Sequence, residues 1–210
     1  MKELIIVGAR GWGREVLWAS RTYENDGYIK IKGFLDSDPT VLDGLRGDFP
    51  PILCAPEDYE VQPDDIFFVA LGDPIQRHKY YNIIKEKGGE FGTYISPKAT
   101  VSPNATIGAG SFIDEYVSIS DNAEVGEQCI VQRMTTLGHD VKVGSFSTIG
   151  ANCFCGGQAK VGDFTTVNVA STILRHVNVG SNAVVGAGSV VIKGVNDGEH
   201  VFGNPAKRIF

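Results

Sequence analysis

The chain has 210 residues, of which 26 are glycine, and a formal net charge of −6 at pH 7. Proteins that bind nucleic acid normally carry a basic surface, so this acidic balance argues against that class. No apolar run is long enough to span a membrane, and the N-terminal stretch MKELIIVGARGWG lacks the features of a secretory signal. We therefore expect a cytoplasmic protein whose four cysteines stay reduced.

Residues 1–92 alternate between apolar strands and helical segments, which predicts a small α/β domain with a parallel sheet. The strand ELIIV is followed by a glycine turn and a helix, and such a turn can present N–H groups to phosphate. Two further strands end at acidic or glycine-containing segments, and ligands of parallel sheets bind at these carboxyl ends. The turn reads GxxGxG instead of the dinucleotide pattern GxGxxG, so its glycines could equally serve only a tight turn.

An aliphatic residue recurs every six residues from Ile95 to Val191, and only Cys155 interrupts the series. A small residue stands two places before each, and glycine often follows. This period fits short strands joined by corners, with three hexads closing an 18-residue coil and coils stacked about 4.8 Å apart. We predict an all-β solenoid over residues 93–210, with Cys153 and Cys155 as core thiols and with glycines relieving backbone strain at the corners.

His139 lies near a predicted corner, and histidine is the natural general base near neutral pH. Residues 18 apart should stack, so Gly157 lies one coil away, where its N–H could stabilise an oxyanion. Arg175 continues this column and could meet phosphates. Asp140 need not orient the ring, because neighbours on a strand face opposite sides unless the corner bends. The alternative for His139 is a solvated corner residue.

Four motifs, VGARGWGRE, FLDSD, LGHDVKVG within the hexads, and VFGNPAKRI, together resemble the bacterial nucleotide-sugar acetyltransferases of the PglD/NeuD-like family. The resemblance spans nearly the whole chain. It implies a Rossmann-like nucleotide-sugar-binding domain over 1–92, and a left-handed parallel β-helix with a C-terminal tail over 93–210. It further implies acetyl-CoA-dependent N-acetylation of a nucleotide-linked amino sugar in surface-glycan biosynthesis, a homotrimer with active sites at the subunit interfaces, and no metal.

The candidate site residues fall into three groups. His139 is expected to be the general base and Asp140 its acidic partner. The cofactor is expected to meet Gly157, Arg175, Ala187 and Lys207. The nucleotide sugar is expected to meet Gly8, Gly11, Trp12, Gly13, Asp36, Ser37 and Gly72.

Four positions depart from the family pattern, at Trp12, Ser37, Gln132 and Thr148. Relatives often have histidine, a second acid, asparagine and a second histidine at these places. A different amino sugar, O-acetylation of a sugar hydroxyl, or a small acceptor therefore remains open. A non-catalytic β-helix scaffold, which would bind no CoA, is the alternative from outside the enzyme class.

Overall fold

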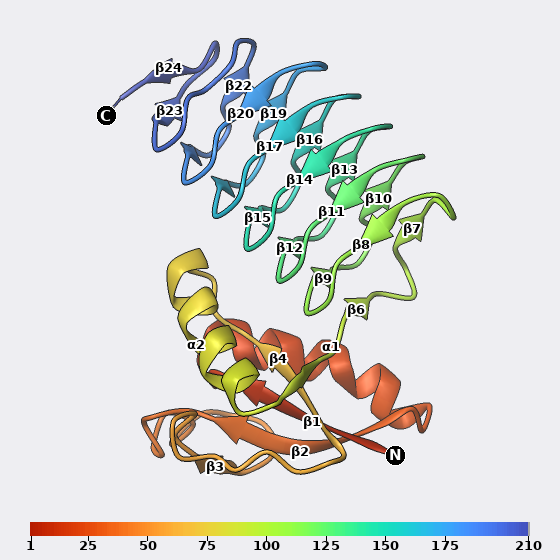
Figure 1. The fold of residues 1–210 in the computed structure, drawn as a ribbon, viewed down its shortest axis with the longest axis vertical. Helices are drawn as coiled ribbons and strands as arrows, with labels where there is room; N and C mark the ends of the chain where they lie inside the picture. Colours follow the sequence, from red (N-terminus) through yellow and green to blue (C-terminus); the bar gives the residue numbers. More distant parts are fainter. Residues whose placement is uncertain (210) are drawn as a thin grey trace. The chain divides into compact units, whose positions relative to one another are not determined.

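The computed structural model describes residues 1–209, and the chain forms two compact units, the first Met1–Gly92 and the second beginning at Thr93 (Figure 1). Each unit has its own sheets and its own buried core.

The first unit is a five-stranded parallel sheet with two helices, and its strand order is β3-β2-β1-β4-β5. Helix α2 begins at a proline, and the Asp73 carboxylate before it accepts a hydrogen bond of 2.8 Å from the Gln76 N–H, which caps the helix start. Neither helix is long and apolar enough to cross a membrane. The elements are β1 (Lys2–Val7), α1 (Gly11–Asn25), β2 (Ile29–Leu35), β3 (Ile52–Cys54), β4 (Asp65–Val69), α2 (Pro74–Glu86) and β5 (Glu90–Phe91).

The second unit is a β-solenoid made of short strands that stack into three sheets. One sheet contains β7 (Thr100–Val101), β10 (Ser118–Ile119), β13 (Thr136–Leu137), β16 (Phe154–Cys155), β19 (Thr172–Ile173) and β22 (Val190–Val191). The next contains β8 (Thr106–Ile107), β11 (Glu124–Val125), β14 (Lys142–Val143), β17 (Lys160–Val161) and β20 (Asn178–Val179). The third contains β6 (Tyr94–Ile95), β9 (Phe112–Ile113), β12 (Ile130–Val131), β15 (Thr148–Ile149), β18 (Thr166–Val167), β21 (Val184–Val185), β23 (His200–Phe202) and β24 (Lys207–Arg208).

The strand register confirms the predicted 18-residue coil. Ser118 pairs with Thr136 and Thr136 pairs with Phe154, so residues one coil apart lie side by side. The recurring aliphatic side chains form one buried cluster along the inside of the solenoid. Cys155, the exception in the series, is fully buried with them, as predicted.

The expectation that glycine relieves backbone strain at the corners was wrong. From Ile107 to Val185, the left-handed backbone occurs three residues after each position of the series and is adopted mostly by residues other than glycine, among them Asp140 with φ of 59°. The glycines that directly follow the aliphatic residues are needed for space. A Cβ on Gly138 would lie 2.8 Å from the Gly157 nitrogen, and one on Gly150 would lie 2.7 Å from the Val169 nitrogen. Close stacking of the coils therefore excludes a side chain there.

The small inward residues do more than fit a crowded corner, because many of them also satisfy the corner carbonyls. The Thr135 hydroxyl donates to the Gly150 carbonyl at 2.7 Å, and the Ser147 hydroxyl donates to the Gly162 carbonyl at 2.7 Å. A buried carbonyl without a partner is costly. These hydrogen bonds therefore stabilise the corners from which the exposed side chains project.

Candidate active site

The exposed ring of His139 follows β13 and is held by its neighbour Asp140. The His139 Nδ1 lies 2.8 Å from the Asp140 Oδ2. Neighbours on an extended strand would face opposite sides, but Asp140 has φ of 59°, so the chain turns at that residue. The bend is what brings the carboxylate to the ring.

The Asp140 carboxylate has a second partner one coil away. Its Oδ1 accepts a hydrogen bond of 2.7 Å from the Asn122 side-chain amide. The hydrogen bonds from Asn122 and then His139 lower the pKa of Asp140 below its ordinary value, so the carboxylate stays charged. A charged acceptor favours the ring tautomer with the proton on Nδ1, which leaves the lone pair on Nε2.

The Nε2 atom faces Gly157 on the next coil. A Cβ built on Gly157 would lie 2.5 Å from Nε2, so only glycine at position 157 leaves room for the His139 ring. Within residues 1–209 the Gly157 N–H donates no hydrogen bond, and the residue is half-buried. A proton acceptor and an unused N–H donor therefore lie side by side, which is the arrangement that acyl transfer requires.

The four residues expected to meet the cofactor are not all at this corner. Gly157 and Arg175 follow β16 and β19, neighbours in the sheet that contains β13, so they continue the His139 column. Ala187 follows β21 of a different sheet and lies at another corner. Lys207 is exposed in β24, which pairs antiparallel with β23.

The cysteines do not contribute a nucleophile at this corner. Cys153 and Cys155 are buried, and burial raises the pKa of both thiols, that of Cys155 to about 12. The reactive form of cysteine is the thiolate, so both remain core thiols, as predicted. Residues 1–209 contain no group of three or more His, Cys, Asp or Glu placed to hold a metal ion.

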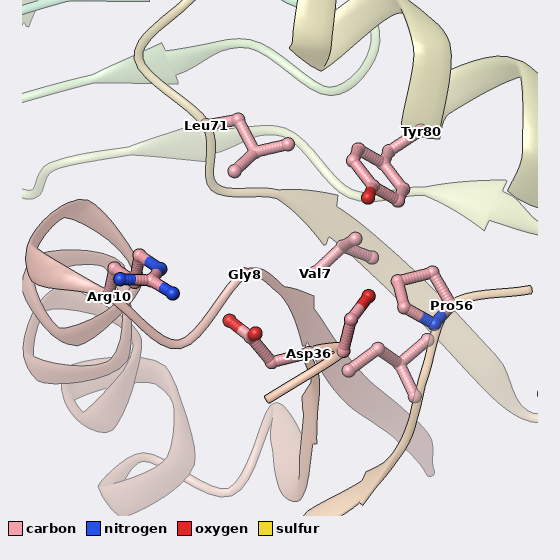
Figure 2. A pocket seen from close by; sticks show the side chains of 9 residues that line it. Val7, Gly8, Arg10, Asp36, Pro56, Leu71 and Tyr80 are labelled. Atoms are coloured by element: carbon pink, nitrogen blue, oxygen red, sulfur yellow. The ribbon is translucent and has the colours of Figure 1, made fainter. Parts of the chain in front are cut away.

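A pocket of about 240 Å³ opens in the first unit at the carboxyl ends of β1, β2 and β4 (Figure 2). Three of the expected substrate residues, Gly8, Asp36 and Ser37, line it. Four of the expected residues, Gly11, Trp12, Gly13 and Gly72, do not line its wall. The other lining residues are Val7, Arg10, Leu35, Pro56, Leu71 and Tyr80.

The residues of the glycine turn have different physical roles. Gly8 has φ of +97°, a conformation that favours glycine. A Cβ on Gly13 would lie 1.9 Å from the Gly8 carbonyl oxygen, so Gly13 permits close packing of α1 on the turn. A Cβ on Gly11 would meet nothing within 4 Å. Half-buried Trp12 and exposed Gly72 complete this edge of the unit.

The Asp36 carboxylate organises the pocket wall. Its Oδ2 accepts from the Ala9 N–H at 2.9 Å and its Oδ1 accepts from the Asp38 N–H at 3.1 Å. The bond from Ala9 ties the end of β2 to the glycine turn after β1, and the bond from Asp38 closes a tight turn directly after β2. The carboxylate keeps lone pairs for a ligand.

Sequence reasoning missed three residues of these sites, and two of them had a usable signal. Asn122 lies one 18-residue coil before Asp140, so the column argument applied to Asp140 would have found it. Arg10 is the cation between Gly8 and Gly11 in the glycine turn. Tyr80 comes from the middle of α2, and no sequence pattern indicates that it reaches the pocket.

Two family models match the chain, the PglD N-terminal domain over residues 3–84 and the GMPPB C-terminal domain over residues 95–192. No protein with a curated function matches it in sequence. Among solved structures, PerB from Caulobacter crescentus in complex with CoA and GDP-perosamine has a TM-score of 0.88 and 25% identity, covering 100% of this chain and 98% of its own.

Two other structures show the same architecture. The acetyltransferase domain of PglB from Neisseria gonorrhoeae, in complex with acetyl coenzyme A, has a TM-score of 0.59 and 25% identity, covering 99% of each chain. WeeI from Acinetobacter baumannii has a TM-score of 0.74 and 20% identity over the full length of both chains, which supports the fold.

The chain is thus a β-solenoid protein with an N-terminal α/β unit, and it carries an exposed His–Asp pair beside Gly157. Residues 3–84 match the PglD N-terminal domain, and over its whole length the chain is similar in fold to PerB and to the acetyltransferase domain of PglB.

Proposed function

We propose that this protein is an acetyl-CoA-dependent N-acetyltransferase that acts on a nucleotide-linked amino sugar in bacterial surface-glycan biosynthesis. One observation carries the proposal. His139 is held at Nδ1 by Asp140, while its Nε2 faces Gly157, whose N–H has no acceptor among the described residues.

The chemistry follows from these atoms. His139 Nε2 removes a proton from the acceptor amine as the nitrogen forms its bond to the acetyl carbon. The Gly157 N–H donates to the carbonyl oxygen as that oxygen gains charge. The carbon–sulfur bond then breaks, and the proton held on Nε2 passes to the departing thiolate. Asp140 stabilises the imidazolium while the ring carries this proton.

Acetyl-CoA supplies the activated acetyl thioester, and the residues present fit it. A side chain on Gly157 would fill the space beside Nε2, so glycine keeps that space open for a thioester. Exposed Arg175 stacks one coil beyond Gly157 and suits the phosphates of the donor. Ala187 and Lys207 are proposed to contact the remainder of the cofactor.

The nucleotide part of the acceptor is assigned to the pocket of the first unit, with Gly8, Asp36 and Ser37 on its wall. Gly11, Trp12, Gly13 and Gly72 are proposed to support the same edge. The complex of PerB with GDP-perosamine supports an amino sugar linked to a nucleotide as the acceptor class.

The finer features implied by the family belong to the same proposal. They are a Rossmann-like first domain, a left-handed winding of the β-helix, and action in the cytoplasm, where acetyl-CoA is available. We also propose a homotrimer with active sites at the subunit interfaces. The His139 side chain is 65% exposed in the single chain, so a neighbouring copy would supply the second wall of its pocket. Analytical ultracentrifugation tests the trimer.

The decisive experiment measures thiol release from acetyl-CoA with a panel of UDP-, dTDP- and GDP-linked amino sugars. We expect turnover on at least one, and a loss of about 10²–10⁴-fold in kcat for His139→Asn. The matched control is His176→Asn, because His176 is an exposed corner histidine whose φ of 63° suits asparagine.

The other outcomes separate the alternatives. Turnover only on sugar hydroxyls or small acceptors would indicate O-acetylation or a small-molecule substrate. An absence of acetyl-CoA binding would overturn the enzyme and leave the scaffold. An unchanged kcat in His139→Asn would overturn the role of His139.

A further inference from the structure

Arg10 carries the only positive charge on the described wall of the pocket in the first unit. Its side chain is 73% exposed, and the first turn of α1, which follows it, contains no acidic residue. Figure 2 shows the guanidinium on the same side of the pocket as the Asp36 carboxylate, with Tyr80 and Pro56 toward the other side. The pocket therefore has a charged end and a largely uncharged end.

Within residues 1–209, Arg10 has only a weak partner. Its Nη2 lies 3.9 Å from the Asp38 Oδ2, and both side chains are exposed, so this ion pair contributes little. The Asp38 carboxylate is already held by Thr40, whose N–H and hydroxyl donate to Oδ1 at 3.0 and 2.7 Å. Those two bonds lower the pKa of Asp38 more than Arg10 does. Arg10 can therefore leave Asp38 at little cost.

Within the same described residues, Asp36 forms no ion pair with Arg10 either. Both of its oxygens accept backbone N–H groups, from Ala9 and Asp38. The guanidinium is thus a planar, permanently charged fork at the edge of a ligand-sized pocket, and such forks match phosphate oxygens with two parallel hydrogen bonds.

We propose that Arg10 binds the diphosphate of the nucleotide sugar and makes the pocket select diphosphates over monophosphates and nucleosides. In this arrangement the nucleoside lies toward Ser37, Pro56 and Tyr80, and the carboxylate of Asp36 accepts from its N–H or O–H groups. The inference rests on the proposed function, because it takes the acceptor to be a nucleotide sugar. Relatives often have histidine where this chain has Trp12. In this chain, Arg10 would supply a phosphate contact from the same turn.

Isothermal titration calorimetry of the full chain with UDP, dTDP and GDP, and with the corresponding monophosphates and nucleosides, tests this directly. We expect Arg10→Ala to weaken binding of the preferred diphosphate by about tenfold or more, since a hydrogen bond to a charged group has roughly that effect. Binding of the nucleoside should change by less than about twofold. Arg10→Lys keeps the positive charge but lacks the planar fork of the guanidinium. Its affinity for the diphosphate should therefore lie between those of the wild type and Arg10→Ala.

The matched control is Arg14→Ala. Arg14 lies one turn further along α1 and lines a separate hollow with Arg46. Its replacement by alanine removes the same charge as Arg10→Ala. An equal loss in Arg14→Ala would show a general charge effect and overturn the assignment to Arg10.

Failure of the inference and failure of the proposed function give different results. If the wild type binds a diphosphate and Arg10→Ala binds it equally well, Arg10 is not the phosphate ligand, and the proposed function stands. If the wild type binds none of these compounds, the pocket is not a site for these nucleotides, and both the inference and the proposed acceptor class fail.

Discussion

Two aspartates in equivalent local settings do different work in the two units. Asp36 and Asp140 both come shortly after a strand, at a place where the chain turns. Asp36 uses both oxygens on backbone N–H groups, from Ala9 and Asp38. Asp140 uses both on side chains, Asn122 and His139. The residue type alone therefore does not decide whether a carboxylate shapes a turn or orients a base; the donors around it do.

The glycines of the two units differ in the same way. In the solenoid, most of the glycines after the aliphatic residues share one role, because a Cβ on them would collide with the backbone of the next coil. In the N-terminal turn, Gly8 is needed for its φ, Gly13 for its lack of a side chain, and Gly11 for neither. A repeat gives each position many copies, whereas a single turn gives each residue its own environment.

The largest effect on stability is expected within that turn. Gly13→Ala places a methyl group 1.9 Å from the Gly8 carbonyl oxygen, a backbone atom that cannot yield cheaply. We expect a loss of about 3 kcal/mol in the free energy of unfolding of the first unit. Gly11→Ala is the matched control, and it should change stability by less than about 1 kcal/mol, because the space there is open. Urea denaturation of both variants measures the difference, and equal values would contradict the assigned packing role.

The next effect tests Asp140 as an orienting group. Asn tolerates the φ of 59° at this position, so Asp140→Asn removes charge without strain. We expect kcat to fall about 10–100-fold while the free energy of unfolding changes by less than about 1 kcal/mol. A fall in stability that matches the fall in activity would make Asp140 structural, like Asp36.

The pH dependence sharpens this prediction. Hydrogen bonds from Asn122 and His139 lower the pKa of Asp140 below the ordinary value of 3.8, so the charged form persists as the pH falls. Between about pH 5 and pH 8 Asp140 is fully ionised. In the His139→Asn background, where the ring cannot titrate, the change in free energy of unfolding caused by Asp140→Asn should therefore be constant over this range. A change that shrinks as the pH drops from 7 to 5 would show that Asp140 titrates there and would contradict the assignment.

The smallest effect is expected for Asp36→Asn. The amide keeps one oxygen acceptor but places an NH₂ group against one of the two backbone donors, at Ala9 or Asp38. We expect the first unit to lose about 1–2 kcal/mol of stability. With saturating nucleotide sugar, kcat should change by less than about threefold. A large loss of kcat with unchanged stability would reverse the contrast between the two aspartates.

The repeat explains why so much of the second unit could be predicted from sequence. A period of six predicts short strands, an 18-residue coil and a buried aliphatic column, and the register and burial confirm all three. The same spacing predicts that Gly157 stacks beside His139. In the structure, a Cβ added to Gly157 would lie 2.5 Å from the His139 Nε2, so the two residues are neighbours. The resemblance alone did not place Ala187 relative to this column, and its strand belongs to a different sheet from that of Gly157.

The first unit was less predictable, since its pocket depends on contacts between elements that are distant in sequence. The strand ends were expected to carry Asp36 and Ser37, and both line the pocket. Arg10 and Tyr80 reach the same pocket from a turn and from α2, and only the packing of the unit reveals this.

The sequence by itself determined the β-solenoid, its core and the stacking of residues one coil apart, because these follow from a repeated local pattern and a constant strand spacing. Tertiary structure alone decided which atoms meet. The left-handed turn at Asp140 brings its carboxylate to the His139 ring, and the close approach of coils reserves the space at Gly138 for backbone. Backbone dihedral angles and contacts between coils set these details, and neither is written in the spacing of residue types.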